Sequence, residues 1–286
     1  MPSLIDIRRR IRSVKNTQQI TKAMKMVSAA KLRRAQDRVV ASRPYGTLLR
    51  KVLANVAAAA TSEEGGAKNP LLAQRPERRI LVVLVTSDKG LAGAFNANTI
   101  KGAQRLVAER REVEVRMELL GRKGRDFFRK RGATISGEYI NLAAKVQYDD
   151  LAAIARKAIE MYCRDEIDAV YLVYNEFKSV VSQKLTETRI LPVDVPRDAA
   201  PVDYIYEQPP AEMLAALLPR YVEMEFYRAQ LESTAAEHAA RMTAMDAATS
   251  NAGEMIDKLT LYMNRVRQAS ITKEIIEVVS GAAAAE

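Results

Sequence analysis

Apolar side chains recur at steps of three and four residues through the last quarter of the chain, from Leu214 to Val266. Thirteen of these sixteen positions are apolar, whereas the overall hydrophobic content of 48% would give about eight. A seam that continues over about seven heptads is the pattern of a coiled coil. No proline follows Pro219, so we expect a helix that reaches Ser280 and is about 90 Å long. The sixteen positions are Leu214, Leu217, Tyr221, Met224, Arg228, Leu231, Ala235, His238, Met242, Met245, Thr249, Ala252, Ile256, Leu259, Met263 and Val266.

The first 58 residues carry a similar but interrupted stripe, which predicts a second long helix. Proline clashes with the preceding helical turn and lacks a backbone donor, so Pro44, together with Gly46, predicts a kink or a break there. For the same reason Pro219 predicts a kink or a separate first turn in the C-terminal helix. The N-terminal stripe consists of Leu4, Ile7, Ile11 and Val14, followed after the polar run 16–19 by Ile20, Met24 and Val27.

The two terminal segments carry opposite charge. Residues 1–58 contain 14 Lys or Arg against two Asp, and residues 212–286 contain 7 basic against 11 acidic residues. Opposite charges favour pairing of the two helices. An antiparallel pair would bring both ends of the chain into one structure and leave the middle as an inserted domain.

The middle of the chain, about 78–208, alternates strand-like and helix-like segments, which predicts a mostly parallel α/β sheet. Val180–Leu191 is expected to add an edge strand. Thr61–Pro76 contains two glycines and two prolines and is expected to form a loop between helix and domain. The segments are strands at Ile80–Thr86, Val113–Leu120, Ala133–Ser136 and Ala169–Tyr174, and helices up to Arg110, through Phe127 and Phe128, and from Asp149 to Arg164.

The predicted fold class is therefore α/β with a long antiparallel coiled coil. The helices of residues 1–58 and 209–286 form the coiled coil, residues 59–77 are a linker, and residues 78–208 form a Rossmann-like, mostly parallel α/β domain inserted between the helices.

The net charge of +10 indicates an anionic partner, which could be nucleic acid, a lipid surface or an acidic protein. The single cysteine, Cys163, excludes an internal disulfide. No stretch approaches about 18 uninterrupted apolar residues, so we expect no membrane-spanning helix.

Two glycine-containing turns could hold phosphate. Thr86–Gly93 follows a strand and opens a helix, but it matches neither the P-loop nor the dinucleotide motif, so we favour a structural turn. Gly121–Arg125 could be a phosphate site or a solvated basic turn. His238, the only histidine, falls on the C-terminal seam, where a polar residue that sets the register is the favoured interpretation. Neither metal nor cofactor binding is predicted.

Several runs resemble the gamma-subunit family of bacterial F-type ATP synthases. The resemblance is carried by Ile271–Ala284, Arg241–Ala248, Asn264–Ser270 and Asn16–Val27, with weaker likeness at Thr86–Asn96 and Tyr204–Glu207. It covers essentially the whole chain. Two other classes stay open from the residues alone: a nucleotide-binding enzyme with a helical dimerisation arm, and a basic coiled-coil nucleic-acid adaptor.

The resemblance implies a non-catalytic central-stalk rotor. Its partners would be the alpha and beta subunits of the catalytic head, the epsilon subunit and the membrane rotor ring, without nucleic acid or direct membrane insertion. It would lie peripherally on the cytoplasmic side of the cell inner membrane. The residues expected to meet an acidic beta-subunit loop are Met24, Lys25 and, facing them, Arg267 and Gln268, and those expected to meet the ring or epsilon are Tyr204, Tyr206 and Glu207.

Overall fold

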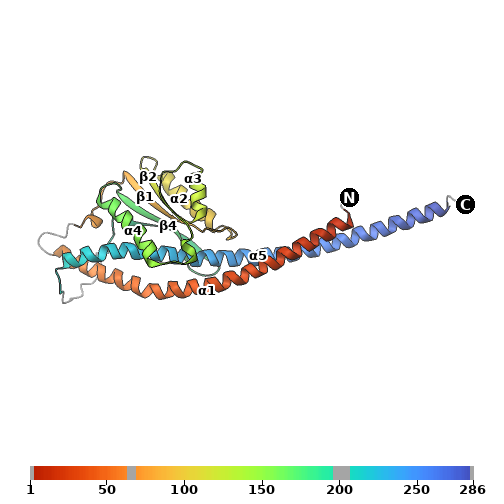
Figure 1. Cartoon of the computed structure of the whole chain (residues 1–286), viewed down its shortest axis with the longest axis horizontal. Coiled ribbons are helices and arrows are strands. Elements are labelled where there is room, and N and C mark those ends of the chain that lie inside the picture. The colour runs from red at the N-terminus through yellow and green to blue at the C-terminus, as the bar shows by residue number, and fades with distance from the viewer. Residues whose placement is uncertain (1–2, 63–68, 196–206, 284–286) are drawn as a thin grey trace. The chain divides into compact units, whose positions relative to one another are not determined.

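The computed structural model describes residues 3–62, 69–195 and 207–283. The chain divides into two compact units, one of Met1–Ser28 with Met242–Glu286 and one of Ala29–Arg241. Two helices contribute to both units, α1 (Leu4–Ser62) and α5 (Pro210–Ala283), drawn in red to orange and in blue in Figure 1.

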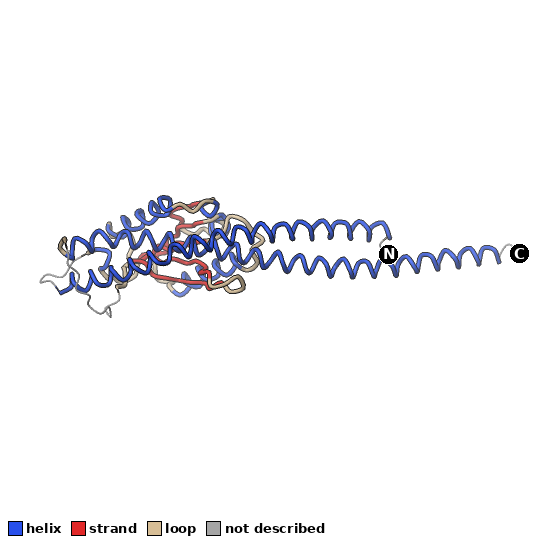
Figure 2. The backbone as a smooth tube through the Cα atoms, turned by 90° about the horizontal axis from the view of Figure 1, so that it is seen from below, coloured by secondary structure: helices blue, strands red, loops and turns tan. Residues whose placement is uncertain are grey.

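The first unit is an antiparallel pair formed by the beginning of α1 and the end of α5 (Figure 2). The Lys25 Nζ atom lies 2.5 Å from Asp246 Oδ1. The Thr249 hydroxyl donates to Thr21 Oγ1 over 2.8 Å, and Gln18 Nε2 donates to the Thr249 carbonyl over 3.4 Å. Residue numbers therefore decrease along α1 in the direction in which they increase along α5, which confirms the antiparallel pairing.

The predicted phase of the C-terminal seam is confirmed in this unit. Met245 and Ala252 are buried, with 5% and 8% of their surface exposed. Their successors at Ile256, Leu259, Met263 and Val266 are half-buried. On α1 the first predicted stripe also faces inward, with Ile7 buried and Leu4, Ile11 and Val14 half-buried.

The second part of the predicted N-terminal stripe is wrong at Ile20 and Val27, whereas Met24 is half-buried as expected. Ile20 is 60% exposed and Val27 is 56% exposed, whereas Thr21 and Ser28 are buried. Steps of four and three residues from Val14 lead to positions 18, 21, 25 and 28, so polar side chains continue the seam. The prediction placed only apolar residues of α1 in the seam, and this gave the wrong helical phase after Val14. Gln18 and Thr21 lie in the seam because they form hydrogen bonds to Thr249 of α5, which hydropathy does not reveal.

The second unit contains a five-stranded sheet in the order β3-β2-β1-β4-β5. Figure 1 labels three of these strands, β1, β2 and β4. The first four strands in this order are parallel, and β5 pairs antiparallel with β4. The predicted, mostly parallel sheet with an edge strand is thus confirmed. The strands are β1 (Arg79–Val85), β2 (Glu114–Leu120), β3 (Ile135–Tyr139), β4 (Ala169–Phe177) and β5 (Gln183–Leu191).

Helices cover the sheet because its strands are apolar on both faces. Alternate residues of β1, Ile80, Val82 and Leu84, join one core with α2 and α3, and the residues between them are equally buried. On α4, Arg156 Nε donates to Glu223 of α5 over 2.6 Å. The helices are α2 (Phe95–Glu109), α3 (Arg122–Arg129) and α4 (Tyr148–Cys163), with short 3-10 helices η1 (Pro70–Leu72) and η2 (Leu142–Ala144).

The middle of α5 is buried on all its faces. Every residue in Val222–Phe226 and Ala229–Glu237 is buried, although a coiled-coil seam would bury only one stripe. Four of these residues are glutamates, and each pairs with an arginine. The ion pairs are Glu223–Arg156, Glu225–Arg50 and Glu225–Arg228, Glu232–Arg43, and Glu237–Arg241.

Both long helices continue through their prolines, so the break considered at Pro44 is wrong. Pro44 lies on an exposed face, where the carbonyl left without a partner can bind water. At Pro219 the flanking residues Leu218 and Val222 are fully buried, and their packing offsets one missing hydrogen bond.

Candidate functional site

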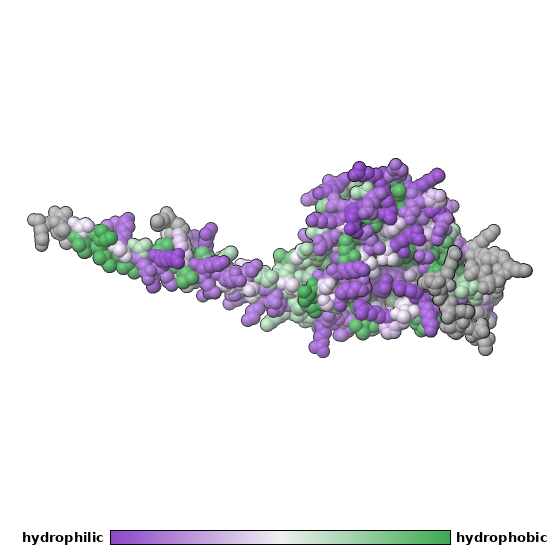
Figure 3. Space-filling model, turned by 180° about the vertical axis from the view of Figure 1, so that it is seen from behind, coloured by the Kyte–Doolittle hydropathy of each residue, from purple (hydrophilic) through white to green (hydrophobic). Residues whose placement is uncertain are grey.

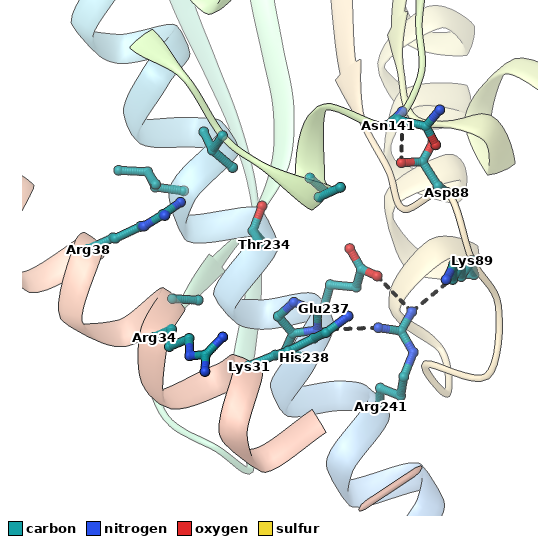
Figure 4. A pocket seen from close by; sticks show the side chains of 15 residues that line it. Lys31, Arg34, Arg38, Asp88, Lys89, Asn141, Thr234, Glu237, His238 and Arg241 are labelled. Carbon is teal, nitrogen blue, oxygen red and sulfur yellow. Dashed lines mark hydrogen bonds and ion pairs between the residues drawn. The ribbon is translucent and has the colours of Figure 1, made fainter. Parts of the chain in front are cut away.

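A cleft of about 280 Å³ lies in the second unit, where α1 and α5 meet the loops at the carboxyl ends of β1 and β3 (Figure 4). Open α/β sheets commonly bind ligands at this edge. The polar and charged lining residues are Lys31, Arg34 and Arg38 of α1, Thr234, Glu237, His238 and Arg241 of α5, and Asp88, Lys89 and Asn141 of the loops.

Positive side chains outnumber acidic ones in this cleft. Within the described ranges, Lys31, Arg34 and Arg38 form no ion pair. By contrast, Glu237 pairs with Arg241, and Asp88 accepts hydrogen bonds from two backbone N–H groups. The α1 side of the cleft therefore carries uncompensated positive charge and favours an anionic partner.

Arg241 makes the densest set of contacts in the cleft. It is 8% exposed, and its Nη2 donates to Glu237 Oε1 over 2.7 Å. The same nitrogen donates to the carbonyls of Gly90 and Lys89 over 3.2 and 3.3 Å, and Nε donates to Gly90 over 3.3 Å. Its Nη1 lies 3.4 Å from His238 Nδ1, as the dashed lines in Figure 4 show. One buried guanidinium thus joins α5 to the turn after β1.

The turn after β1, which was considered as a phosphate loop, presents carbonyl oxygens to Arg241. The turn is also bound to α2, since Ser87 N donates to Asn96 Oδ1 over 3.0 Å. The Ser87 hydroxyl donates to the Lys89 carbonyl over 2.5 Å. Phosphate binding requires N–H groups that converge on an anion. Carbonyls that converge on a guanidinium do the opposite, so this turn holds a cation of its own chain.

The second turn, Gly121–Arg125, is also occupied by the chain itself. Arg122 N, at the N-terminus of α3, donates to Asp88 Oδ1 over 3.1 Å. The other oxygen of Asp88 accepts from Asn141 N over 3.0 Å. A carboxylate is favoured at a helix N-terminus, where it fills the position that a bound phosphate would take. Asp88 therefore ties together the loops that follow β1, β2 and β3.

The cleft also changes how two groups of α5 titrate. Burial lowers the pKa of His238 to about 4, and the charges of Arg241 and Lys31 act in the same direction. His238 is therefore neutral near pH 7, and its Nδ1 can accept from Arg241. Burial raises the pKa of the Glu237 carboxyl, although Arg241 opposes this effect. The register role of His238 stays a prediction. Among the described residues no group of three or more His, Cys, Asp or Glu side chains could hold a metal ion.

The four residues expected to meet a beta subunit lie in the first unit, but they form two places rather than one. Lys25 faces Asp246, not Arg267. Asp246 and Arg267 are 21 positions apart, which corresponds to about 30 Å of helix. Met24 and Lys25 are half-buried, whereas Arg267 and Gln268 are exposed. The assumption that the two pairs face each other is therefore wrong.

Among the described residues of the first unit, none covers the end of α5. Every residue from Ile271 to Ser280 is exposed, because α1 begins at Leu4 and α5 continues beyond it (Figure 2). Apolar side chains contribute to the surface toward this end of α5 (Figure 3). The exposed apolar residues are Ile271, Ile275, Ile276, Val278 and Val279, each at least 47% exposed.

The remaining predicted contact residues precede α5. Tyr204 and Tyr206 lie outside the described residues. Glu207 is exposed and stands just ahead of Pro210, where the helix begins. Sequence reasoning missed Arg241 as a site residue. It lies next to the seam position Met242, and nothing in the sequence links it to the carbonyls of Gly90 and Lys89, which are 151 and 152 residues away.

Comparisons with known proteins agree with one another. Residues 3–285 match the family model described as ATP synthase. The ATP synthase gamma chain of Solibacter usitatus is 76% identical over 286 residues, which cover 100% of both chains. That of Anaeromyxobacter sp. (strain Fw109-5) is 52% identical over 289 residues, 99% of each chain.

Among solved structures, a chain of the Tetrahymena thermophila mitochondrial ATP synthase central stalk/c-ring is 25% identical with a TM-score of 0.63. The match covers 80% of this chain and 99% of that one. A chain of the Euglena gracilis mitochondrial ATP synthase in rotational state 3 is 20% identical, with a TM-score of 0.67 and coverage of 98% and 94%. The latter shows likeness of fold.

Proposed function

Because the chain belongs to the ATP synthase gamma-chain family, we propose that it acts as the rotor shaft between a proton-driven membrane ring and the catalytic head. Rotation of the shaft would move each beta subunit in turn through its nucleotide-binding states, by shifting the populations of its conformations. The chain is a non-catalytic subunit, and proton flow and ATP chemistry belong to its partners.

The observation that carries this proposal is the exposed end of α5. Five apolar side chains at Ile271–Val279 have no cover within the unit. Contiguous exposed apolar surface of this kind marks a protein interaction site. A surrounding ring of alpha and beta subunits would bury it while leaving the helix free to turn.

The first unit would contact the beta subunits at two separate sites. Met24 and Lys25 would meet the acidic beta-subunit loop at one level of the shaft, and Arg267 and Gln268 would meet the head at a second level. The exposed apolar residues Ile20, Met26 and Val27 extend the first place. An acidic partner is supported by the excess of basic residues in 1–58.

Residues 78–208 would engage the ring and the epsilon subunit, with Tyr204, Tyr206 and Glu207 as contacts. In this proposal 1–58 and 209–286 act as shaft and 59–77 as linker. No helix in the described ranges is long and apolar enough to cross a membrane. We place the protein peripherally, on the cytoplasmic side of the inner membrane.

The test is purification of a tagged copy from its own cells. We expect alpha, beta, epsilon and ring subunits to co-purify, ATP hydrolysis to follow the complex, and the isolated chain to have none. Persistent hydrolysis by the isolated chain would contradict a non-catalytic shaft. Recovery of duplex DNA in place of the subunits, with binding that weakens steeply as salt rises, would favour the nucleic-acid adaptor.

A further inference from the structure

We propose that Arg241 fastens α5 to the edge of the sheet, so that the helix and the α/β domain turn together when torque passes along α5. This inference rests on the proposed rotor function and assigns one part of it to one residue. Arg241 is then a positioning residue for energy transfer.

The geometry of the contact supports this role. Three hydrogen bonds run from the Arg241 guanidinium to the carbonyls of Lys89 and Gly90, and a fourth runs to Glu237, one helical turn earlier. A planar guanidinium that binds several acceptors fixes its orientation as well as its distance. Arg156 and Phe177 N also donate to glutamates of α5, Glu223 and Glu232. Arg241 adds the attachment to the turn after β1.

The receiving turn is itself firmly connected. The Asp88 carboxylate binds the backbone N–H groups of Arg122 and Asn141, and Ser87 binds Asn96 of α2. A force on Lys89 and Gly90 is therefore passed to the loops of three parallel strands and to α2. No other side chain in the cleft joins α5 to this turn by hydrogen bonds that involve residues described here.

The position of Arg241 along α5 gives it leverage. It is the last residue of the second unit, and Met242 begins the segment that pairs with the N-terminal part of α1. Any twist that travels along α5 from the C-terminal side reaches Arg241 before the buried stretch that ends at Glu237. A rigid attachment here limits how much of the twist is lost within the helix.

The first measurement is amide hydrogen exchange on the full chain with Arg241→Lys and Arg241→Ala. Lysine keeps the charge but cannot bind the two carbonyls and Glu237 in one plane. We expect protection of residues 87–93 to decrease in the order Arg, Lys, Ala, by about tenfold or more for Ala, as for a lost hydrogen bond to a charged group. Arg220→Lys, an exposed arginine of the same helix, is the matched control and should leave these amides unchanged.

The second measurement uses the assembled complex in vesicles and compares proton pumping with ATP hydrolysis. We expect the Arg241 variants to assemble and hydrolyse ATP but to pump fewer protons per ATP, in the same order, while Arg220→Lys couples normally. Should Arg241→Ala fail to fold, the comparison of Arg with Lys decides.

Loss of loop protection with a normal pumping ratio would overturn the proposal, since Arg241 would then be only structural. So would unchanged protection in both variants, or an equal loss of coupling in Arg220→Lys. Failure of the unmodified chain to join a coupled complex would instead overturn the proposed function, which keeps the two failures distinct.

Discussion

His238, which is half-buried, shows how a single residue makes stability depend on pH. Its pKa is lowered from 6.5 to about 4 in the folded chain. Between about pH 6.5 and pH 4 the unfolded chain therefore binds more protons than the folded chain, and stability decreases as the pH falls through this range. A shift of this size corresponds to about 3 kcal/mol.

We expect wild type to lose about that much stability relative to His238→Gln between about pH 7 and pH 4. Glutamine can still accept a hydrogen bond from Arg241, so the contact is largely kept. Urea unfolding at the two pH values measures the difference. A difference in unfolding free energy between wild type and His238→Gln that does not change with pH would show that His238 has the same pKa in the folded and unfolded states.

Two glycines with positive φ allow strain to be separated from crowding. At Gly121, φ is 98° and a Cβ atom would lie 2.2 Å from the Thr86 carbonyl oxygen. At Gly132, φ is 66° and nothing lies within 4 Å. We expect Gly121→Ala to cost about 3 kcal/mol or more, because the backbone of the Asp88 turn must move, and Gly132→Ala to cost about 1 kcal/mol. Equal losses on thermal unfolding would contradict the close approach of the two loops.

At the scale of elements, the sequence predicted what repetition can reveal. The strands of the sheet and the seam from Met245 to Val266 follow short periods, and both are found. Gln18 and Thr21 are polar residues at seam positions, so the apolar pattern is interrupted there although the helix itself is regular. The prediction failed at this point. The all-round burial of Val222–Glu237 could not be predicted, because glutamates in a helix read as a solvent face until their arginine partners are known.

The seam phase of the first unit can be tested with two neighbours. Leu259 is half-buried in the seam, and Lys258 is exposed. A carboxylate at Leu259 would be partly removed from water without a partner, at a cost of about 1 to 3 kcal/mol. We therefore expect Leu259→Asp to lower the unfolding temperature of the isolated chain clearly more than Lys258→Asp. Similar losses would mean that the phase assigned to α5 is wrong.

At the scale of the whole molecule, the exposed end of α5 separates folding from assembly. Every residue from Ile271 to Ser280 is exposed, so removal of this segment should leave the stability of the chain nearly unchanged. We expect deletion of 271–286 to leave the unfolding temperature as it is and to reduce the yield and coupling of the complex. A large loss of stability in the isolated protein would show that this segment folds back on the chain.

The function was predictable from motifs, whereas the site was only partly so. Whole-chain resemblance gave the family, and the comparisons agree. The expectation that Met24 faces Arg267 was wrong. Which residues face each other depends on the register of α1 against α5, and short motifs carry no information about that register. Arg241 and its turn are 150 residues apart, and only the fold brings them together.

The continuity of α5 constrains how the gene can change. One helix serves both as a core element of the second unit, through Val222–Glu237, and as one half of the pair in the first. Each residue turns a helix by about 100°, so a single insertion after Arg241 would rotate every later seam position away from its partner on α1. Seven inserted residues would leave the phase within about 20°. Insertions and deletions in this stretch should therefore survive selection mainly in whole heptads.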